Sequence, residues 1–199
     1  MVATIDGKIV SGERGEDVSD LGSPVDHAVL RHLEDLADGV LIGAGTLRAT
    51  PTGWDPNTRF RIAVSNSGRV EASHTFFSGP EAFVAGPAAS SFVESGGVRR
   101  LVAGKEEFDP KAAFGELRRL GCRLLLALGG SRMNGSLFAA GLVDEIFLTM
   151  APAIKLGEGL PTVAEGRPFP RGALPVFEIV EHHAVGNEIF LRYRRFAER

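Results

Sequence analysis

Two glycines, Gly129 and Gly130, stand between an apolar run of residues 122–128 and a predicted helix over residues 131–140. Because glycine has no Cβ, a ligand can approach the backbone closely at this turn. The free N–H groups of the first helical turn would point at that ligand, and the helix dipole favours an anion. The segment therefore suits a phosphate or pyrophosphate, although paired glycines can equally form only a tight turn between a strand and a helix.

Two more strand ends carry groups that can hold an anion. The apolar residues 39–42 lead into GAGT, residues 43–46, which lacks the GxGxxG spacing of a dinucleotide fingerprint. Residues 61–64 lead into SNSGR, residues 65–69, whose hydroxyls, amide and guanidinium suit a phosphate monoester. Each segment on its own can be a plain polar turn. The three junctions together predict a nucleotide-like cofactor at the carboxyl ends of strands.

Metal and covalent chemistry have no support in the sequence. His27 and His32 are five residues apart on a predicted helix, and His182 and His183 are adjacent on a predicted strand, so neither pair converges on one ion. The sequence contains no GxSxG, HExxH, CxxC or P-loop motif. No metal is therefore expected, and the motifs identify no catalytic residue.

The only tryptophan, Trp54, lies in a loop predicted for residues 50–58, which Arg48 and Arg59 bracket. An exposed tryptophan in a loop can stack on a ligand or contact a second subunit. The alternative is that Trp54 folds over the core of its own chain. The sequence leaves both alternatives open.

Composition excludes several classes of protein. The chain has 199 residues, of which 44% are hydrophobic, which suits one globular domain over residues 1–199. The net charge of -3, without a basic stripe, gives no support for nucleic-acid binding. Cys122 is the single cysteine and is expected to be a buried hydrophobe within its strand. No run approaches the ~20 apolar residues of a membrane span, so a cytoplasmic protein without a membrane partner is expected.

The elements that must position these groups alternate between strands and helices. Helices are predicted to start at Ser23-Pro24 and at Pro110, the second ending at Gly121, because Ser before Pro and terminal Gly are typical helix boundaries. The predicted strands are residues 1–5, 39–42, 61–64, 82–85, 100–103, 122–128 and 143–150, followed by a hairpin of residues 176–182 and 188–195. Residues 11–23 and 155–175 are predicted as loops, and residues 88–94 as a helical turn.

This order predicts an α/β fold with three α-β-α layers, a mostly parallel central sheet and an antiparallel C-terminal hairpin. The first strand is short because it starts at Met1. Either the sheet begins abruptly, or the reading frame starts downstream of the natural beginning.

The chain resembles the reductase domain of the bifunctional riboflavin-biosynthesis deaminase-reductases, which has the dihydrofolate reductase-like fold. The resemblance covers residues 1–194 and rests on the order of TIDGK, VLIGAGT, VSNSGRV, LALGGSRMNGSLFAAGLVDEIFLTMAP and NEIFLRYR. The segment GSLFAAGLVDEIFLTMAP is the most specific. Since no deaminase domain is present, the resemblance implies a stand-alone reductase unit.

The resemblance implies NADPH as cofactor and hydride transfer to the ribosyl group of a pyrimidine phosphate, as in the 5-amino-6-(5-phosphoribosylamino)uracil reductase of riboflavin biosynthesis. By the resemblance, the 2′-phosphate would lie near Ser65, Asn66 and Arg69. The other implied cofactor contacts, to the pyrophosphate and its surroundings, are Thr46, Gly129, Gly130, Ser131, Arg132, Met133 and Asn134. It also implies a homodimer formed through the C-terminal end of the sheet.

The substrate side departs from the family pattern at three places. Leu128 stands where the family has Glu, residues 33–35 read LED in place of LRA, and residues 49–51 read ATP in place of an ADDP turn. Leu cannot accept a hydrogen bond, and an unmet polar group costs about 1–3 kcal/mol. An acidic Glu34 in place of Arg would repel a phosphate. The substrate is therefore expected to be shifted, with Asp6, Arg31, Thr50 and Leu128 as the candidate substrate contacts.

Three functions follow as alternatives. The first is an NADPH-dependent reductase acting on a small molecule. The second is a nucleotide-binding or regulatory protein that has kept the fold and lost the reaction. The third is a dihydrofolate reductase-type enzyme, which the C-terminal signature favours less. The proton donor is not identified, because the turn at Asp6-Gly7 gives Asp6 a structural role just as readily as a catalytic one.

Overall fold

The strands and helices of the computed structural model follow the apolar pattern of the sequence closely. The structure describes residues 1–16, 20–50 and 53–196. It divides into two compact units: one combines Met1–His27 with Ser131–Arg199, and the other is Ala28–Gly130. Each unit contains one β-sheet.

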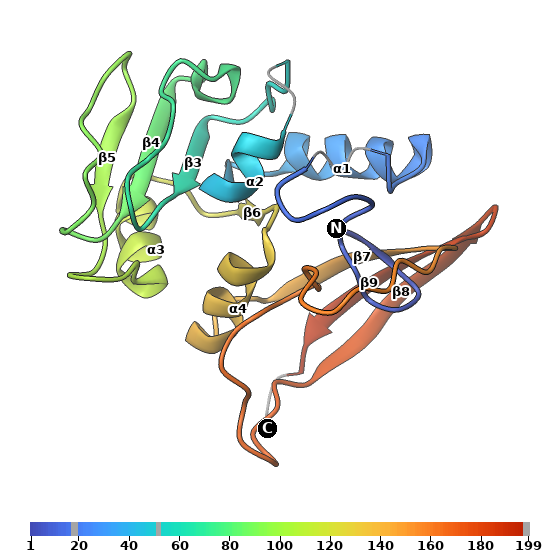
Figure 1. Cartoon of the computed structure of the whole chain (residues 1–199). Helices are drawn as coiled ribbons and strands as arrows, with labels where there is room; N and C mark the ends of the chain where they lie inside the picture. The colour runs from blue at the N-terminus through green and yellow to red at the C-terminus, as the bar shows by residue number, and fades with distance from the viewer. Residues whose placement is uncertain (17–19, 51–52, 197–199) are drawn as a thin grey trace. The chain divides into compact units, whose positions relative to one another are not determined.

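The unit Ala28–Gly130 is built on a parallel five-stranded sheet. Its strand order is β5-β4-β3-β2-β6, and every neighbouring pair runs parallel (Figure 1). The strands are β2 (Gly39–Gly43), β3 (Phe60–Val64), β4 (Glu81–Gly86), β5 (Arg99–Val102) and β6 (Leu125–Ala127). Strands β2, β3 and β4 are almost entirely buried, which explains why they read as continuous apolar runs. Their side chains form a core with Phe76, Phe77 and Phe92.

The helices of this part of the chain begin and end where local signals place them. Helix α1 (Pro24–Leu36) begins after Ser23, whose Oγ accepts hydrogen bonds from the N–H groups of Val25 and Asp26. Helix α3 (Pro110–Arg119) is capped by the Asp109 carboxylate, and Gly121 follows it with a φ of 99°. Two short helices, α2 (Ala44–Ala49) and the 3-10 helix η1 (Thr75–Phe77), were not predicted.

The other unit contains a mixed four-stranded sheet of order β1-β7-β9-β8. Strands β1 (Val2–Thr4) and β7 (Glu145–Ala151) are parallel, while β9 (Glu188–Arg195) is antiparallel to both β7 and β8 (Phe177–Val185). Helix α4 spans Ser131–Ala140 and ends at Gly141, as predicted. The antiparallel C-terminal hairpin and the parallel strand pairs are thus confirmed, and the strands form two sheets.

Two local predictions are wrong. Cys122 is buried, but it precedes β6, which starts only at Leu125. The reason is that the Asp38 carboxylate accepts the N–H groups of Arg123 and Leu124, at 2.8 and 2.9 Å, so this segment forms a turn and not a ladder. Burial raises the pKa of the Cys122 thiol to about 11, which agrees with its expected role as a buried hydrophobe. The predicted helical turn at residues 88–94 is limited to its start, where the Ser90 N–H donates to the Pro87 carbonyl at 3.0 Å, and the rest of the segment is irregular.

None of the helices in the described ranges has both the length and the apolar character needed to cross a bilayer.

Candidate cofactor site

The glycines of the predicted pyrophosphate site are packed against the end of β2. The Gly43 N–H donates to the Gly129 carbonyl at 2.7 Å. A Cβ on Gly43 would lie 3.3 Å from the Gly130 nitrogen, and a Cβ on Gly130 would lie 2.7 Å from Thr46 Oγ1. Gly129 has a φ of 96°, which L-residues rarely adopt, and the Gly129–Gly130 peptide bond is cis. This junction therefore has no room for side chains, and it brings together Gly43, Thr46, Gly129 and Gly130.

Thr46 occupies a different local structure from the one expected. The sequence predicted no helix after the strand of residues 39–42, but residues 44–49 form helix α2, with Gly43 as N-cap and Thr46 in the first turn. The Thr46 hydroxyl points toward Gly130, as the short Cβ distance shows. Thr46 and the two glycines are thus side by side although they are more than 80 residues apart in sequence.

The first turn of α4 offers backbone donors rather than side chains. The Asn134 amide donates to the Val163 carbonyl at 2.7 Å, and the Ser131 hydroxyl donates to the Glu165 carboxylate at 2.9 Å. Met133 is buried, and only Arg132 is exposed. Within the described residues, the N–H groups of Ser131, Arg132 and Met133 donate to no protein acceptor. An anion at this helix start would therefore be bound by main-chain N–H groups, with Arg132 as the available cation.

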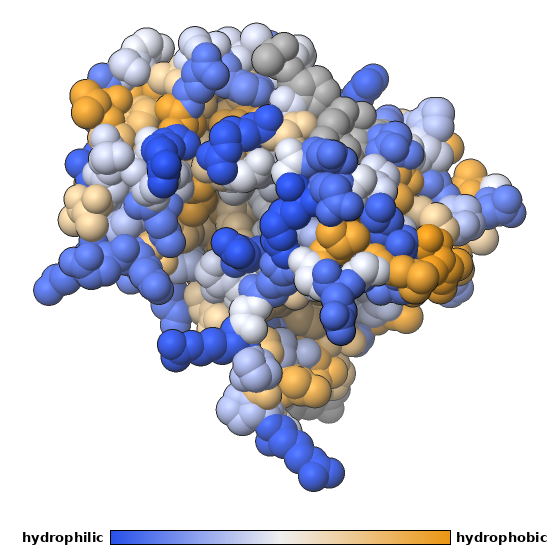
Figure 2. All heavy atoms as spheres, in the orientation of Figure 1, coloured by the Kyte–Doolittle hydropathy of each residue, from blue (hydrophilic) through white to orange (hydrophobic). Residues whose placement is uncertain are grey.

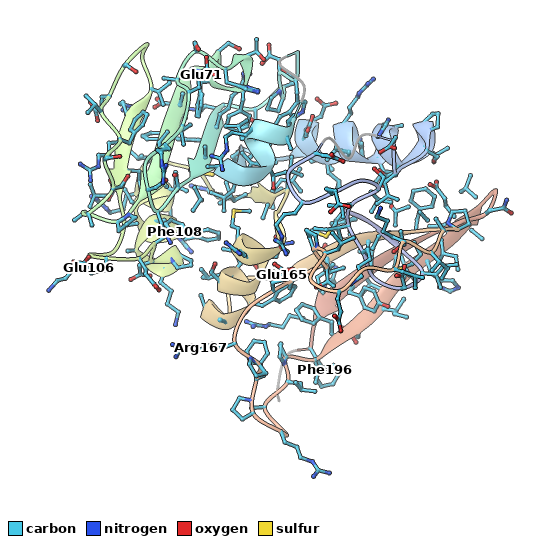
Figure 3. All side chains as sticks on the ribbon, in the orientation of Figure 1. Glu71, Glu106, Phe108, Glu165, Arg167 and Phe196 are labelled. Carbon is cyan, nitrogen blue, oxygen red and sulfur yellow. The ribbon has the colours of Figure 1, made fainter. Side chains whose placement is uncertain are left out.

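The start of this helix is stabilised by a salt bridge. The sequence did not suggest this ion pair. Arg14 donates to both carboxylate oxygens of Glu165, at 2.8 and 3.2 Å, and to the Gly159 carbonyl at 2.9 Å. Figure 3 shows Glu165 beside α4. The hydrogen bonds from Arg14 and Ser131 lower the pKa of Glu165, so its carboxylate is charged at neutral pH. Because these partners are 151 and 34 residues from Glu165, no local pattern could have identified them.

Two of the three predicted phosphate ligands in the loop after β3 already accept hydrogen bonds from main-chain N–H groups of the protein. The Ser65 hydroxyl accepts the Gly68 N–H at 3.0 Å, and Ser65 is buried. The Asn66 Oδ1 accepts the N–H of Phe108, labelled in Figure 3, at 3.0 Å. Arg69 is exposed, and its guanidinium has no hydrogen bond or ion pair within the described ranges. Of the three, Arg69 is therefore the residue with a charged group left for a ligand.

Both carboxylate oxygens of Asp6 accept hydrogen bonds from residues of the same unit. Its Oδ1 accepts the Thr4 hydroxyl at 2.6 Å and the Lys155 N–H at 3.1 Å, and its Oδ2 accepts the Leu156 N–H at 2.8 Å. These bonds, that of Thr4 foremost, lower the pKa of Asp6 to about 2. They also hold Leu156 at a φ of 59°, which is uncommon for a residue other than glycine. Asp6 is thus a structural carboxylate, ionised at neutral pH and unsuited to donate a proton.

Replacing Asp6 with Asn is expected to lower the stability of the protein at neutral pH. Because the pKa of Asp6 is depressed, its stabilising effect is fully present above the ordinary value of 3.8 and is lost as the pH falls through about 2. Urea unfolding should therefore show a lower midpoint for Asp6→Asn at pH 7 and a difference that disappears near pH 2. The exposed Asp144→Asn serves as the control, and an unchanged midpoint for Asp6→Asn at pH 7 would contradict the structural role.

The Glu34 carboxylate is engaged inside its own unit, whereas the sequence suggested that it would repel a substrate phosphate. Its side chain is buried, with the residue only 5% exposed, and its Oε1 accepts the Trp54 indole N–H at 3.2 Å. Burial is the main cause that raises the pKa of Glu34. The Trp54 ring stacks on Phe76, with ring centroids 5.1 Å apart, and packs against the core. Of the two alternatives for Trp54, folding over its own core is therefore the one observed.

The remaining candidate substrate residues lie on three different segments of the unit Ala28–Gly130. Leu128 packs against the hydrophobic core. The Thr50 hydroxyl donates to the Thr46 carbonyl at 2.9 Å and ends helix α2. Arg31 is exposed on α1, and no hydrogen bond in the described part of the chain joins it to either residue. Pro51 lies outside the described residues.

No cluster of three or more His, Cys, Asp or Glu side chains suited to a metal ion occurs in residues 1–16, 20–50 and 53–196.

Comparisons with known proteins connect this geometry to a family. A family model described as the RibD C-terminal domain matches residues 1–191. The 2,5-diamino-6-ribosylamino-4(3H)-pyrimidinone 5′-phosphate reductase of Methanothermobacter thermautotrophicus is 24% identical over 208 residues, covering 96% of this chain and 93% of that protein. The reductase of the same name from Aquifex aeolicus is 27% identical over 188 residues, covering 83% and 80%.

A solved structure shows the same fold. The pyrimidine reductase-like protein from Corynebacterium diphtheriae superimposes with a TM-score of 0.77 at 21% identity, covering 99% of this chain and 90% of that one. This similarity confirms the predicted three-layer α/β fold class.

Proposed function

This chain belongs to the RibD C-terminal domain family, and we propose that it is an NADPH-dependent reductase of a ribosylaminopyrimidine phosphate or a closely related small molecule. The family match over residues 1–191 confirms the resemblance found in the sequence. The curated relatives, which are named as reductases, support the class of reaction. We regard residues 1–199 as one reductase domain composed of the two units.

The observation that carries this proposal is the junction of Gly43, Thr46, Gly129 and Gly130. Backbone and the Thr46 hydroxyl meet there so closely that a Cβ on Gly43 or Gly130 would contact a neighbour at 3.3 Å or less. The chain then passes directly from Gly130 into a helix whose first N–H groups have no protein acceptor in the described residues. Unpaired backbone donors at a glycine turn before a helix are the arrangement that binds phosphate groups.

The residues present fit a dinucleotide cofactor. Gly129, Gly130 and the N–H groups of residues 131–134 would bind the pyrophosphate, with Thr46 beside them and Arg132 supplying a positive charge. Arg69 would pair with the 2′-phosphate, while Ser65 and Asn66 hold the shape of its loop. When bound, the reduced nicotinamide supplies the hydride.

The role of the protein is to bind and orient the two reactants, since hydride transfer depends chiefly on their positioning. Asp6 is ionised and held by three hydrogen bonds, so the proton would come from another group or from solvent. The case for a shifted substrate now rests on Leu128 and on the departure at residues 49–51, because the Glu34 carboxylate is buried under Trp54. Leu128 also favours the second candidate, a protein that binds the nucleotide without reducing a substrate.

Titration with NADPH and NADH, followed by fluorescence, tests the cofactor. Tight binding of NADPH and weak binding of NADH is the expected result, and no binding of either would contradict the proposal. Reduction of 2,5-diamino-6-ribosylamino-4(3H)-pyrimidinone 5′-phosphate is then measured by loss of NADPH absorbance, in parallel with 5-amino-6-(5-phosphoribosylamino)uracil. Turnover of either compound supports the reductase. NADPH binding with no turnover of either would support the binding protein instead.

We also propose a homodimer formed through the sheet that contains the C-terminal hairpin. Ile179 is 55% exposed, Val185 44% and Ile189 46%, all on β8 and β9. Apolar patches also interrupt the hydrophilic surface on the face drawn in Figure 2. Exposed apolar side chains gathered on neighbouring strands favour association. Light scattering at micromolar concentration should give twice the mass of the chain, and a monomer would contradict the dimer.

A further inference from the structure

Arg48 places a guanidinium between two parts of the candidate cofactor site. Arg48 lies in the last turn of α2, and its Nη1 donates to the Arg69 carbonyl at 3.2 Å. Its Nη2 would be 3.9 Å from a Cβ on Gly45, in the first turn of the same helix. The guanidinium therefore lies along α2 and contacts the loop of residues 65–69. All of these residues belong to the unit Ala28–Gly130.

Two arginines without a carboxylate partner consequently lie in adjacent segments, α2 and the loop of residues 65–69. Neither Arg48 nor Arg69 has a carboxylate partner within the described ranges, and both are exposed. Arg61 and Arg99 of the same unit do have such a partner, in Asp55 and Glu81 respectively. The chain has 25 acidic against 22 basic residues, so the lack of a partner does not reflect a shortage of acids. Positive groups left without a counter-charge attract an anion.

The hydrogen bond between Arg48 and the Arg69 carbonyl leaves most of the Arg48 donors unused. A guanidinium has five N–H groups in a rigid fork, and the structure assigns one of them to that carbonyl. The neighbouring Ser65 Oγ and Asn66 Oδ1 already accept internal hydrogen bonds. The cationic donors that α2 and this loop contribute are therefore those of Arg48 and Arg69. A terminal phosphate, with a charge of about -1.5 to -2 and three acceptor oxygens, matches two such groups.

We propose that Arg48 is a specificity-determining residue that binds the 2′-phosphate of NADPH together with Arg69. This inference rests on the proposed NADPH-dependent function. It adds a second arginine to the phosphate contact and explains why α2 carries an unpaired arginine in the turn that faces the 65–69 loop. NADH has a hydroxyl at the 2′ position and gains nothing from that charge.

The test compares Arg48→Ala, Arg48→Lys and Arg69→Ala in the full chain by calorimetric titration with NADPH, NADH and 2′,5′-ADP. Arg48→Ala should weaken binding of NADPH and 2′,5′-ADP by about 10- to 100-fold and leave the Kd for NADH unchanged, because only the charged hydrogen bonds are lost. Arg48→Lys should restore part of the loss. Arg118→Ala, an exposed arginine on α3, is the matched control and should leave every Kd unchanged.

The outcomes separate this inference from the function it depends on. If Arg48→Ala weakens NADPH and NADH equally, or only lowers the melting temperature, Arg48 is a structural tie between α2 and the loop, and the inference is wrong. If the unmodified protein prefers NADPH and the preference survives in Arg48→Ala, the inference alone fails. If the unmodified protein binds none of the three ligands, both the proposed function and this inference are wrong.

Discussion

Gly130→Ala is expected to weaken NADPH binding by at least about 100-fold, which corresponds to about 2.7 kcal/mol of binding free energy. The added Cβ would lie 2.7 Å from Thr46 Oγ1, closer than real Cβ atoms approach other atoms. The adjacent Gly129 has little freedom to shift and relieve this contact, because its carbonyl accepts the N–H of Gly43 in β2 at 2.7 Å. The Thr46 hydroxyl, the glycine backbone or both must therefore move, and these are the groups proposed to hold the pyrophosphate.

Isothermal titration of Gly130→Ala with NADPH measures this effect, with the melting temperature recorded alongside. Gly115→Ala is the matched control, since Gly115 lies within α3 and an added Cβ would meet nothing within 4 Å. That variant should bind NADPH normally and should unfold at the same or a higher temperature. The double variant Gly130→Ala/Thr46→Ala removes the clash and should recover stability without recovering binding. Normal NADPH binding by Gly130→Ala would show that the glycines form only a turn.

Trp54→Ala is expected to lower the free energy of unfolding by about 3–5 kcal/mol, the range for removing a large aromatic side chain from a packed site. The substitution removes the ring that stacks on Phe76, and it leaves the buried Glu34 carboxylate without its indole donor. Trp54→Phe keeps a ring on Phe76 but has no N–H, so it should cost about 1–3 kcal/mol. Urea unfolding of both variants measures the difference.

The pH dependence identifies the contribution of Glu34. Burial raises its pKa in the folded protein, so between the ordinary value of 4.5 and the raised value the folded state binds more protons than the unfolded state. Stability should therefore fall as the pH rises through this window. The Trp54 hydrogen bond lowers the pKa, and its loss extends the window to higher pH. Trp54→Phe, which keeps a ring over Glu34, should thus lose more stability at pH 8 than at pH 4.5.

Glu34→Gln is the control for this dependence. Its amide oxygen can still accept the indole N–H, but it carries no charge, so the fall in stability with rising pH should disappear. Combining Glu34→Gln with Trp54→Phe completes a double-mutant cycle that isolates the pairwise interaction. If Trp54→Phe is as stable as the unmodified protein from pH 5 to pH 8, the buried pair does not support the loop that contains Trp54.

Much of the fold and part of the candidate site follow from the sequence because their signals are local. Ser23 before Pro24 starts α1, Gly141 ends α4, and the apolar residues of β2, β3 and β4 are buried as their pattern predicts. The same is true of the glycines at residues 129 and 130. A missing Cβ and a strand followed by a helix are properties of consecutive residues, and they can be read without knowing what lies nearby.

Only the tertiary structure decided which polar groups remain free. Asp6, Ser131 and Asn134 were candidates by residue type, but each is engaged by a partner at least 29 residues away. Glu34 matched a family position for a charged contact, and the structure buries it beneath Trp54. Arg48 gained its candidate role because it lies against the carbonyl of Arg69. A sequence shows which donors and acceptors a chain has, but long-range packing determines which of them are already satisfied within the protein, and only the remaining groups can bind a ligand.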